Sequence, residues 1–393
     1  MTTTINNEHK KLNVPNLRFK EFQGEWEKCT LSEVCKFHNG RAYKQSELLA
    51  AGKYRILRVG NFFTNDSWYY SNLELEDNKY AQDGDLLYAW SASFGPRFWK
   101  EEKVIYHYHI WKIDSFKNVD KEFMYHFLDL DSSKIKNEVQ GGTMVHITKG
   151  NMEKRTISYP SINEQKKIAK LLSLLDERIS TQNKIIEDLK KLKSAIIDYV
   201  INSLNTDFAK FGSLYEMAGE GGTPTTSNAS FYDNGKIPFI KIDDLKKKYL
   251  TENKDFITEL GLQKSSAWLV PTHSILFSNG ATIGEISITT YPVCTKQGIL
   301  GIVPKQNIDV EFLYYFMSSS YFKKAVSRIV TEGTMKTAYL KDINNILCPI
   351  PTKEKQQEIA KMPSALNSKI DFEQSILKLF CSQKQYLLRQ MFI

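Results

Sequence analysis

The sequence contains no long hydrophobic run and no recognisable leader. No apolar stretch reaches the roughly 18 residues needed to cross a bilayer. The first eleven residues are polar and lack the apolar core of a signal peptide. We therefore expect a cytoplasmic protein. With 393 residues, of which 41% are hydrophobic, the chain is long enough for two or three domains with cores of their own.

Cysteine chemistry is also missing. The five cysteines are scattered, and no two of them form a C-x-x-C pair; they are Cys29, Cys35, Cys294, Cys348 and Cys381. Neither a zinc site nor a disulfide framework is indicated. We expect reduced thiols and no bound metal.

The motifs of nucleotide binding and group transfer are absent as well. There is no G-x-x-x-x-G-K-[ST] phosphate loop, no G-x-G-x-x-G after a strand, no Asn-Pro-Pro-aromatic tetrad and no G-x-S-x-G elbow. The Gly-rich stretch 219–224 lacks the lysine and the helix start of a phosphate site. We predict no catalytic residue in this chain, and this absence favours a role in recognition.

Two histidines have the spacing of half a metal site. His107 and His109 would lie on one face of a strand, because alternate residues of a strand point the same way. No acidic or cysteine partner stands nearby in the sequence. A histidine pair without metal is therefore favoured.

The net charge of +8 is modest for a chain of this length. It is compatible with binding a polyanion such as nucleic acid, but many basic proteins bind none.

The second half of the sequence repeats the first. Val139–Met144 (V-Q-G-G-T-M) and Val330–Met335 (V-T-E-G-T-M) lie 191 residues apart, and the same offset relates 160–170 to 351–361 without a gap. Upstream the offset falls to 189, where 86–95 matches 275–284, and then to 183, where 52–59 matches 235–242. Several matches in the same order indicate an internal duplication, which dictates the architecture.

Each half begins with about 145 residues rich in glycine, proline and aromatic residues. Runs with β-character are bounded by turn signals and predict strands, with short helices between them. The predicted strands are 56–59, 86–90, 104–113, 275–277 and 299–303, and the predicted helices are 121–130 and 311–328. This mixture is typical of an α+β domain.

Each half ends in a long helix. From 161 to 203 there is no Gly or Pro, and apolar residues recur at alternating steps of three and four, which is a coiled-coil seam. The first seam contains Ile168, Leu172, Leu175, Ile179, Ile186, Leu189, Ile196 and Val200, with the polar residues Gln182 and Lys193 within it. The second, 191 residues later, contains Ile359, Leu366, Ile370, Leu377, Phe380, Leu387 and Met391, with Pro363, Glu373 and Lys384 at the remaining positions.

A helix with one apolar stripe must bury it, and each helix offers the other a matching stripe. The order domain, helix, domain, helix favours an antiparallel coiled coil with pseudo-twofold symmetry. The alternative is that each helix packs separately on its own domain. Pro363 stands where the first copy has Leu172. Because proline removes a hydrogen bond and clashes with the preceding turn, we expect the second helix to be kinked or to begin late.

Several segments resemble the specificity subunits of Type I restriction-modification systems. They are Asn13–Phe19, Gly24–Glu27, Leu31–Val34, Gly221–Thr225, Ile237–Ile240, the Gly-Thr-Met elements at 142–144 and 333–335, Pro160–Ala169 with its looser repeat from Pro351, and Leu387–Ile393. The resemblance covers essentially the whole chain. Each motif alone is moderately specific, whereas their order and duplication are highly specific.

The resemblance implies a flexible N-terminus (1–14), a target-recognition domain (15–160), a conserved helix (161–205), a second target-recognition domain (206–351) and a second conserved helix (352–393). Each recognition domain would read one half of a bipartite, asymmetric double-stranded DNA target. The helices would serve as a spacer and as a platform for two methyltransferase subunits, which restriction subunits would join. S-adenosylmethionine, ATP and magnesium would belong to these partners, and this chain would bind none of them.

Polar side chains at base edges and cationic ones at phosphates would carry this recognition. Candidates in the first domain are Arg41, Tyr43, Lys44, Arg58, Asn61, Ser91, Ser93 and Arg97. Candidates in the second are Thr223, Thr225, Lys241, Asp243, Ser278, Asn279, Thr282, Lys296, Gln297 and Lys336.

Two other functions remain open from the sequence. A structural adaptor would carry two protein-binding heads on a helical strut without touching DNA, and the modest charge allows this. An enzyme with an unfamiliar site would act on DNA without partners.

Overall fold

The computed structural model describes residues 13–63, 65–91, 94–138, 146–330 and 336–393. The predicted flexible N-terminus up to residue 12, the candidate Ser93 and the Gly-Thr-Met elements at 142–144 and 333–335 lie outside the described residues. The chain forms two compact units: unit 1 contains residues up to Thr181 together with Leu377–Ile393, and unit 2 contains Gln182–Ile376. No helix within the described ranges combines the length and the apolar character needed to cross a membrane.

Unit 1 contains one two-stranded and two four-stranded sheets, with the strand orders β1-β10, β2-β9-β6-β7 and β4-β3-β8-β5. The strands are β1 (Glu27–Thr30), β2 (Lys36–Asn39), β3 (Tyr54–Leu57), β4 (Tyr69–Ser71), β5 (Tyr80–Ala81), β6 (Leu86–Ala89), β7 (Gly95–Phe98), β8 (Val104–Tyr106), β9 (Ile110–Asp114) and β10 (Thr156–Tyr159). All neighbouring strands are antiparallel except β3 and β8, which are parallel.

Helices pack on the β2-β9-β6-β7 sheet of unit 1 and complete its core. The helices are α1 (Leu31–Val34), α2 (Val59–Phe63), α3 (Lys121–Glu138), α4 (Lys149–Glu153), the start of α5 (Ile162–Ser203) and the end of α10 (Lys353–Met391). Buried Tyr88 and Trp111 of the sheet belong to one hydrophobic cluster with Phe123 of α3, Leu172 of α5 and Leu388 of α10. Both long helices are therefore part of the core of unit 1.

Unit 2 repeats this plan. Its sheets have the orders β11-β20, β12-β19-β16-β17-β14 and β15-β13-β18. The strands are β11 (Phe208–Lys210), β12 (Tyr215–Glu220), β13 (Ile237–Ile240), β14 (Tyr249–Leu250), β15 (Asp255–Ile257), β16 (Ile275–Ser278), β17 (Ile286–Thr289), β18 (Cys294–Thr295), β19 (Ile299–Pro304) and β20 (Leu347–Pro349). The equivalent pair β13 and β18 is again parallel.

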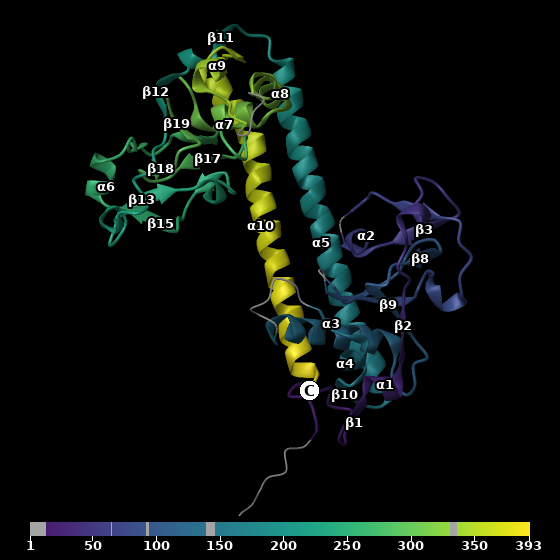
Figure 1. The fold of residues 1–393 in the computed structure, drawn as a ribbon. Coiled ribbons are helices and arrows are strands. Elements are labelled where there is room, and N and C mark those ends of the chain that lie inside the picture. The colour runs from purple at the N-terminus through teal and green to yellow at the C-terminus, as the bar shows by residue number, and fades with distance from the viewer. Residues whose placement is uncertain (1–12, 64, 92–93, 139–145, 331–335) are drawn as a thin grey trace, which may run out of the picture. The chain divides into compact units, whose positions relative to one another are not determined.

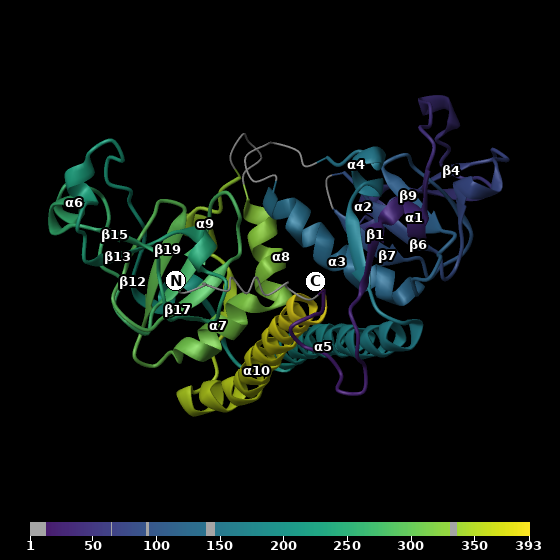
Figure 2. The same cartoon turned by 90° about the horizontal axis from the view of Figure 1, so that it is seen from below.

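The helices of unit 2 include parts of both long helices. They are α6 (Glu259–Gln263), α7 (Val310–Ser318), α8 (Ser320–Ile329), α9 (Leu340–Ile343), the end of α5 and the start of α10. Helix α7 packs on β17 and lies beside α10 (Figure 2). Its Tyr315 hydroxyl is 3.1 Å from the hydroxyl of Ser364 on α10. The core joins Phe277 of β16 and Phe316 of α7 to Ile197 of α5.

Two predicted elements are each divided in the structure. The strand predicted over 104–113 breaks into β8 and β9, because the amide of Ile110 donates to the carbonyl of His107 (2.9 Å) and closes a turn. His107 and His109 therefore do not share a strand face. The helix predicted over 311–328 breaks at Ser319, whose side chain caps α8 by accepting from the amide of Phe322 (3.2 Å).

Helices α5 and α10 lie side by side within each unit (Figure 1). All the predicted seam residues are buried or half-buried. On α5, Ile168, Leu172, Leu175 and Ile186 are buried and Ile179, Leu189, Ile196 and Val200 are half-buried; on α10, Ile370 and Met391 are buried and Ile359, Leu366, Leu377, Phe380 and Leu387 are half-buried. Near the end of α5 the buried positions shift to Ile197 and Ile201, because the helix there packs on the core of unit 2.

The polar positions of the seam show the direction of the pair. In unit 1, Lys384 Nζ lies 2.7 Å from Asp176 Oδ1. In unit 2, Gln182 Nε2 donates to the carbonyl of Glu373 (3.2 Å) and Lys193 Nζ donates to Asn367 Oδ1 (2.9 Å). As numbers rise along α5 those of the partners on α10 fall, so the predicted antiparallel coiled coil is confirmed.

Pro363 does not delay the second helix. Helix α10 begins at Lys353 and continues through this proline to Met391, so the expectation of a late start was wrong. The proline can donate no bond to the preceding turn. Its ring is nevertheless buried, and the helix is continuous at this position.

Candidate nucleic-acid interface

In unit 2, loops from four parts of the chain meet at one edge of the main sheet. They are residues 221–225, 278–284, 296–298 and 336–338, and we call them the loop edge of unit 2. The amide of Asn279 donates to the carbonyl of Gly298 (3.0 Å), and the amide of Ala338 donates to that of Asn279 (2.8 Å). The first loop joins the set through Thr223, whose hydroxyl accepts from the amide of Gln297 (3.4 Å).

Unit 1 has an equivalent loop edge, formed by residues 40–44, 89–91, 107–109 and 146. An isolated β-bridge joins the backbone of Arg41 to that of His107, and another joins Ser91 to His146. The amide of Trp90 also donates to the carbonyl of His109 (3.1 Å). The duplication has therefore kept the same convergence of loops in both units.

A glycine at the same place in each unit allows the first loop to approach the third. A Cβ atom on Gly40 would lie 2.4 Å from the carbonyl oxygen of His107. A Cβ atom on Gly221 would lie 2.2 Å from the carbonyl oxygen of Thr295. Real side chains do not reach such distances, so only glycine fits both positions.

Four predicted DNA-contacting residues of the first domain lie on the loop edge of unit 1. Lys44 is exposed, and half-buried Arg41 pairs with Glu47 (2.8 Å). The ring of Tyr43 stacks near His107, with centroids 6.4 Å apart. Ser91 is buried, so its side chain shapes the loop and cannot reach a base.

Three further candidates of this domain surround α2. Arg58 donates to the carbonyl of Ser67 (3.1 Å), and Asn61 donates to the same carbonyl (2.7 Å). Arg97 donates to the carbonyl of Phe62. These side chains brace the loop after α2, and Arg58 and Asn61 are half-buried while Arg97 is exposed.

The second domain brings most of its candidates to one place. Thr223, Thr225, Ser278, Asn279, Thr282, Lys296, Gln297 and Lys336 all belong to the loop edge, whereas Lys241 and Asp243 lie just after β13. Exposed side chains suited to contact DNA are Thr225, Thr282, Lys296, Gln297 and Lys336, and Thr223 is half-buried. Exposed Lys241 pairs with Asp255 (2.8 Å), and Asp243 is exposed.

Two of these candidates have a structural role. Buried Ser278 donates to the carbonyl of Thr282 (2.6 Å) and accepts from the amide of Glu285 (2.8 Å). Buried Asn279 donates to the carbonyl of Ala338 (3.3 Å). Both side chains hold the turn after β16 in place, so they are not available to contact bases.

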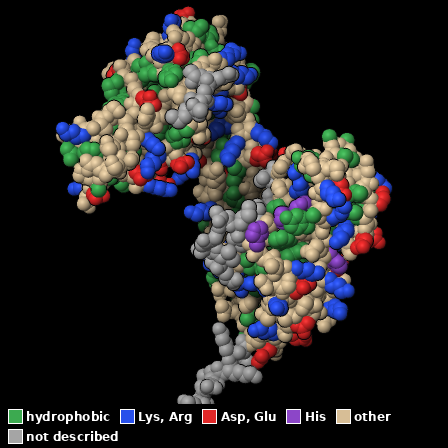
Figure 3. Space-filling model, viewed as in Figure 1, with side chains coloured by type: hydrophobic (Ala, Val, Ile, Leu, Met, Phe, Trp, Pro, Cys, Tyr) green, Lys and Arg blue, Asp and Glu red, His purple; other side chains and the backbone are tan. Residues whose placement is uncertain are grey.

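The predicted DNA-contacting residues do not include an aromatic and histidine cluster at the loop edge of unit 1, of which the sequence singled out only the pair His107 and His109. The rings of His107 and His109 are 4.9 Å apart, and Trp90 lies 5.0 Å from His109 and 6.0 Å from His146. Histidines lie beside hydrophobic side chains on the surface of unit 1 (Figure 3). The repeat is the signal that could have revealed this cluster. The offset of 189 makes His107 the equivalent of Lys296, which was predicted to contact DNA.

His107, the central residue of the cluster, is uncharged at neutral pH. Burial, followed by the charges of His109 and Arg58, lowers the pKa of His107 to about 4. A neutral imidazole presents one donor and one acceptor. This pattern suits contact with a base edge better than with a phosphate. No group of three or more His, Cys, Asp or Glu side chains able to hold a metal ion occurs among the described residues.

Comparison with known proteins identifies relatives of both halves. The profile of the Type I restriction modification DNA specificity domain matches residues 23–191 and again 205–379. The MjaVIII specificity subunit of Methanocaldococcus jannaschii is 25% identical over 317 residues, which cover 75% of this chain and 74% of that protein. The EcoBI specificity subunit of Escherichia coli is 23% identical over 86% of this chain and 78% of its own length.

Solved structures share the fold. The S subunit of a Type I restriction-modification system from M. genitalium superposes with a TM-score of 0.58 at 18% identity, covering 97% of this chain and 99% of that one. A chain from a study of complex assembly in the type I R-M system gives 0.57 at 15% identity, with coverages of 92% and 96%.

Proposed function

This chain belongs to the Type I restriction modification DNA specificity family, and we propose from that membership that its two loop edges read the two halves of a bipartite DNA target. The chain is the specificity subunit and is not itself an enzyme. It reads DNA and assembles with methyltransferase and restriction subunits, which carry the catalysis. The adaptor without DNA contact is therefore not favoured.

One observation carries the assignment of the reading surfaces. The two units share one backbone scaffold, including a glycine at the same place in each, Gly40 and Gly221. The side chains on the two loop edges differ, with His107 in one unit and Lys296 at the equivalent position of the other. Equal scaffolds with unequal side chains are what two readers of different half-sites require. The half-sites should therefore differ, and the complete target should be asymmetric.

The finer parts of the proposal concern partners and cofactors. Two methyltransferase subunits would dock on the coiled coil, one for each unit, because both units contain a stretch of the same helix pair. S-adenosylmethionine, ATP and magnesium would be bound by the partners. Because the DNA target and the partners share one compartment, we propose that the chain acts in the cytoplasm.

Exchange of one recognition domain tests the two-reader proposal. Residues 206–351 would be replaced by the equivalent domain of a relative, and methylated positions would be mapped in cells that carry the methyltransferase subunit. One half-site should change and the other should stay. A change of both halves together would refute the proposal, as would a complex that shows no sequence preference in mobility-shift assays.

Side-chain variants test the residues themselves. Lys296→Ala and Gln297→Ala should alter or weaken reading of one half-site, by about tenfold to a hundredfold where a base contact is lost. His107→Ala should do the same for the other half-site. Lys191→Ala, an exposed residue on α5 that is remote in sequence from both loop edges, is the matched control and should leave both halves unchanged.

A further inference from the structure

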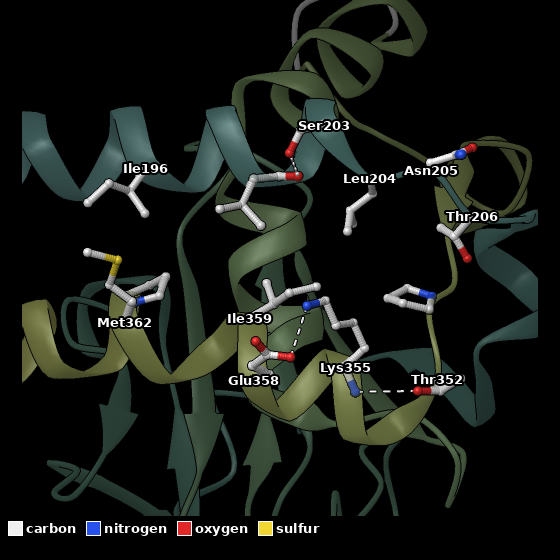
Figure 4. A pocket seen from close by; sticks show the side chains of 13 residues that line it. Ile196, Ser203, Leu204, Asn205, Thr206, Thr352, Lys355, Glu358, Ile359 and Met362 are labelled. Carbon is white, nitrogen blue, oxygen red and sulfur yellow. Dashed lines mark hydrogen bonds and ion pairs between the residues drawn. The ribbon is translucent and has the colours of Figure 1, made fainter.

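Unit 2 contains an open groove between the end of α5 and the start of α10, with a volume of about 610 Å³. Ile196 and Leu204 point toward Ile359 and Met362 across it (Figure 4). Its lining is mostly apolar and also includes Val200 and Pro363. Met362 is 60% exposed, which is unusual for a methionine beside a hydrophobic core.

The equivalent place in unit 1 is covered by the chain itself. The residues of α5 that are equivalent to the α10 side of the groove lie 191 positions earlier in the sequence. They are Glu164, Lys167, Ile168, Leu171 and Leu172. Here the segment 13–23 runs across the helix ends. The amide of Leu17 donates to the carbonyl of Gln390 on α10 (2.9 Å), and Phe19 packs on the cluster that contains Leu172 and Met391.

Charged residues fasten this covering segment. Arg18 Nε lies 2.7 Å from Glu164 Oε1, and Glu164 is 1% exposed. Lys167 pairs with Glu21, and its ammonium lies 4.5 Å from the centroid of the Phe19 ring. The segment therefore presents a basic residue, an aromatic residue and an acidic residue in the order Arg18, Phe19, Glu21.

The same two anchor positions carry reversed charges in unit 2. Lys355 stands at the position of Glu164, and Glu358 stands at the position of Lys167. With the groove open they pair with each other at 2.9 Å, and both are more than half exposed. A segment that fits this groove must carry an acid where the N-terminal segment has Arg18 and a base where it has Glu21.

We propose that this groove is a docking site for an extended segment of the methyltransferase subunit, with the order acid, aromatic or aliphatic residue, any residue, base. The proposal rests on the proposed function, which provides the partner. The reversed charges argue against the N-terminal segment of a second copy, because its Arg18 would face Lys355 and its Glu21 would face Glu358. The apolar residue would cover Met362, as Phe19 and its neighbours cover the equivalent region of unit 1.

Two labelled peptides test the groove on the full chain. One has the natural sequence 13–24, and the other carries the charge reversals Arg18→Glu and Glu21→Lys. Because two repulsive pairs become attractive, the reversed peptide should bind about tenfold more tightly in fluorescence anisotropy. The chain with Lys355→Glu and Glu358→Lys should invert that preference. Equal binding of the two peptides, or no binding of either, would overturn the proposal.

Assembly with the partner tests the occupant. Met362→Asp should weaken co-purification of the cognate methyltransferase subunit at least tenfold, and the reversed peptide should compete with that subunit. Leu260→Asp is the matched control, since Leu260 is 43% exposed on α6 and lies outside the long helices, the groove and the loop edge of unit 2. Unchanged assembly of the Met362 variant, or an equal loss in both variants, would refute docking at the groove.

The two proposals fail in distinguishable ways. If the natural chain neither assembles with the methyltransferase subunit nor prefers a DNA sequence, the proposed function is wrong. If it does both while the groove variants also do both, only the docking proposal is wrong. Circular dichroism of each variant verifies that the fold is intact.

Discussion

Removal of the buried ammonium group of Lys384 should destabilise unit 1 strongly. Lys384 is 12% exposed and lies 2.9 Å from Asp129 Oδ2 and 2.7 Å from Asp176 Oδ1. Burial lowers the pKa of Lys384, but the two carboxylates more than offset this, so that its pKa is raised overall. Lys384→Met would leave two carboxylates close together without a counter-charge.

The expected loss follows from the exposure of the partners. Removing one partner of a fully buried ion pair lowers the free energy of unfolding by about 3–5 kcal/mol. Each carboxylate is 31% exposed, so water offsets part of this cost and we expect about 2–3 kcal/mol at neutral pH. Urea unfolding followed by tryptophan emission reports mainly unit 1, because Trp268 is the one tryptophan of the sequence in unit 2.

The repeat supplies a matched control. Lys193 is the equivalent residue of unit 2, and its partner is the neutral amide of Asn367. Burial lowers the pKa of Lys193, and three neighbouring lysines add to this, although the charge of Asp371 offsets part of the effect. Lys193→Met leaves no carboxylate uncompensated in this pair, so it should change the stability of unit 2 by less than about 1 kcal/mol. Hydrogen exchange over 182–203 would measure this. Equal losses in the two variants would refute the charge argument.

The Lys384→Met loss should also depend on pH. Burial already raises the pKa of Asp176, and removal of the ammonium would raise it further. The folded variant then binds protons before the unfolded chain does, so acid stabilises it relative to neutral pH. The loss should therefore be smaller at pH 5 than at pH 8. A loss that is constant across this range would contradict the account.

Three further predictions concern single residues. Gly221→Ala should lower the melting temperature of unit 2 markedly, by several degrees or more, because its Cβ atom would meet Thr295; an unchanged melting curve would show that the loop can move. Pro363→Leu should stabilise unit 2 by about 1–3 kcal/mol, since the helix would regain a backbone hydrogen bond. If urea unfolding shows that the variant is less stable than the natural chain, the proline ring is needed for packing. Burial lowers the pKa of His126 to about 3, so the unfolded chain takes up a proton first as the pH falls below about 6.5. The free energy of unfolding of unit 1 should therefore fall by up to about 1.4 kcal/mol per pH unit because of this group. His126→Gln should reduce this pH dependence, and an unaltered dependence would exclude His126 as its source.

The duplication and the helix pair were predictable from the sequence because their signals are local and periodic. A step of three and four residues reports one face of a helix, whatever lies against it. The same pattern could not show that α10 tolerates Pro363, since that depends on packing within unit 2. It could not show either that Ile197 and Ile201 are the buried residues at the end of α5.

The candidate reading residues divide in the same way. Polar residues near turns were found from the sequence, but burial decided that Ser278 and Asn279 hold a turn while Lys296 and Gln297 are exposed. The pair His107 and His109 was noticed but not placed at the reading edge, because the turn between β8 and β9 was predicted as continuous strand. A turn of this kind is closed by one backbone hydrogen bond and leaves little trace in the residue pattern.

The amino-acid sequence alone predicts two copies of one plan, each a mixed domain followed by a helix with a matching seam. These properties follow from residue order and from helical periodicity. The folded chain shows in addition which loops meet at each reading edge and which polar residues are buried there. It also shows that the groove beside Met362 is open while its counterpart is covered by 13–23. Those features depend on contacts between residues far apart in the chain, and a periodic pattern carries no information about such contacts.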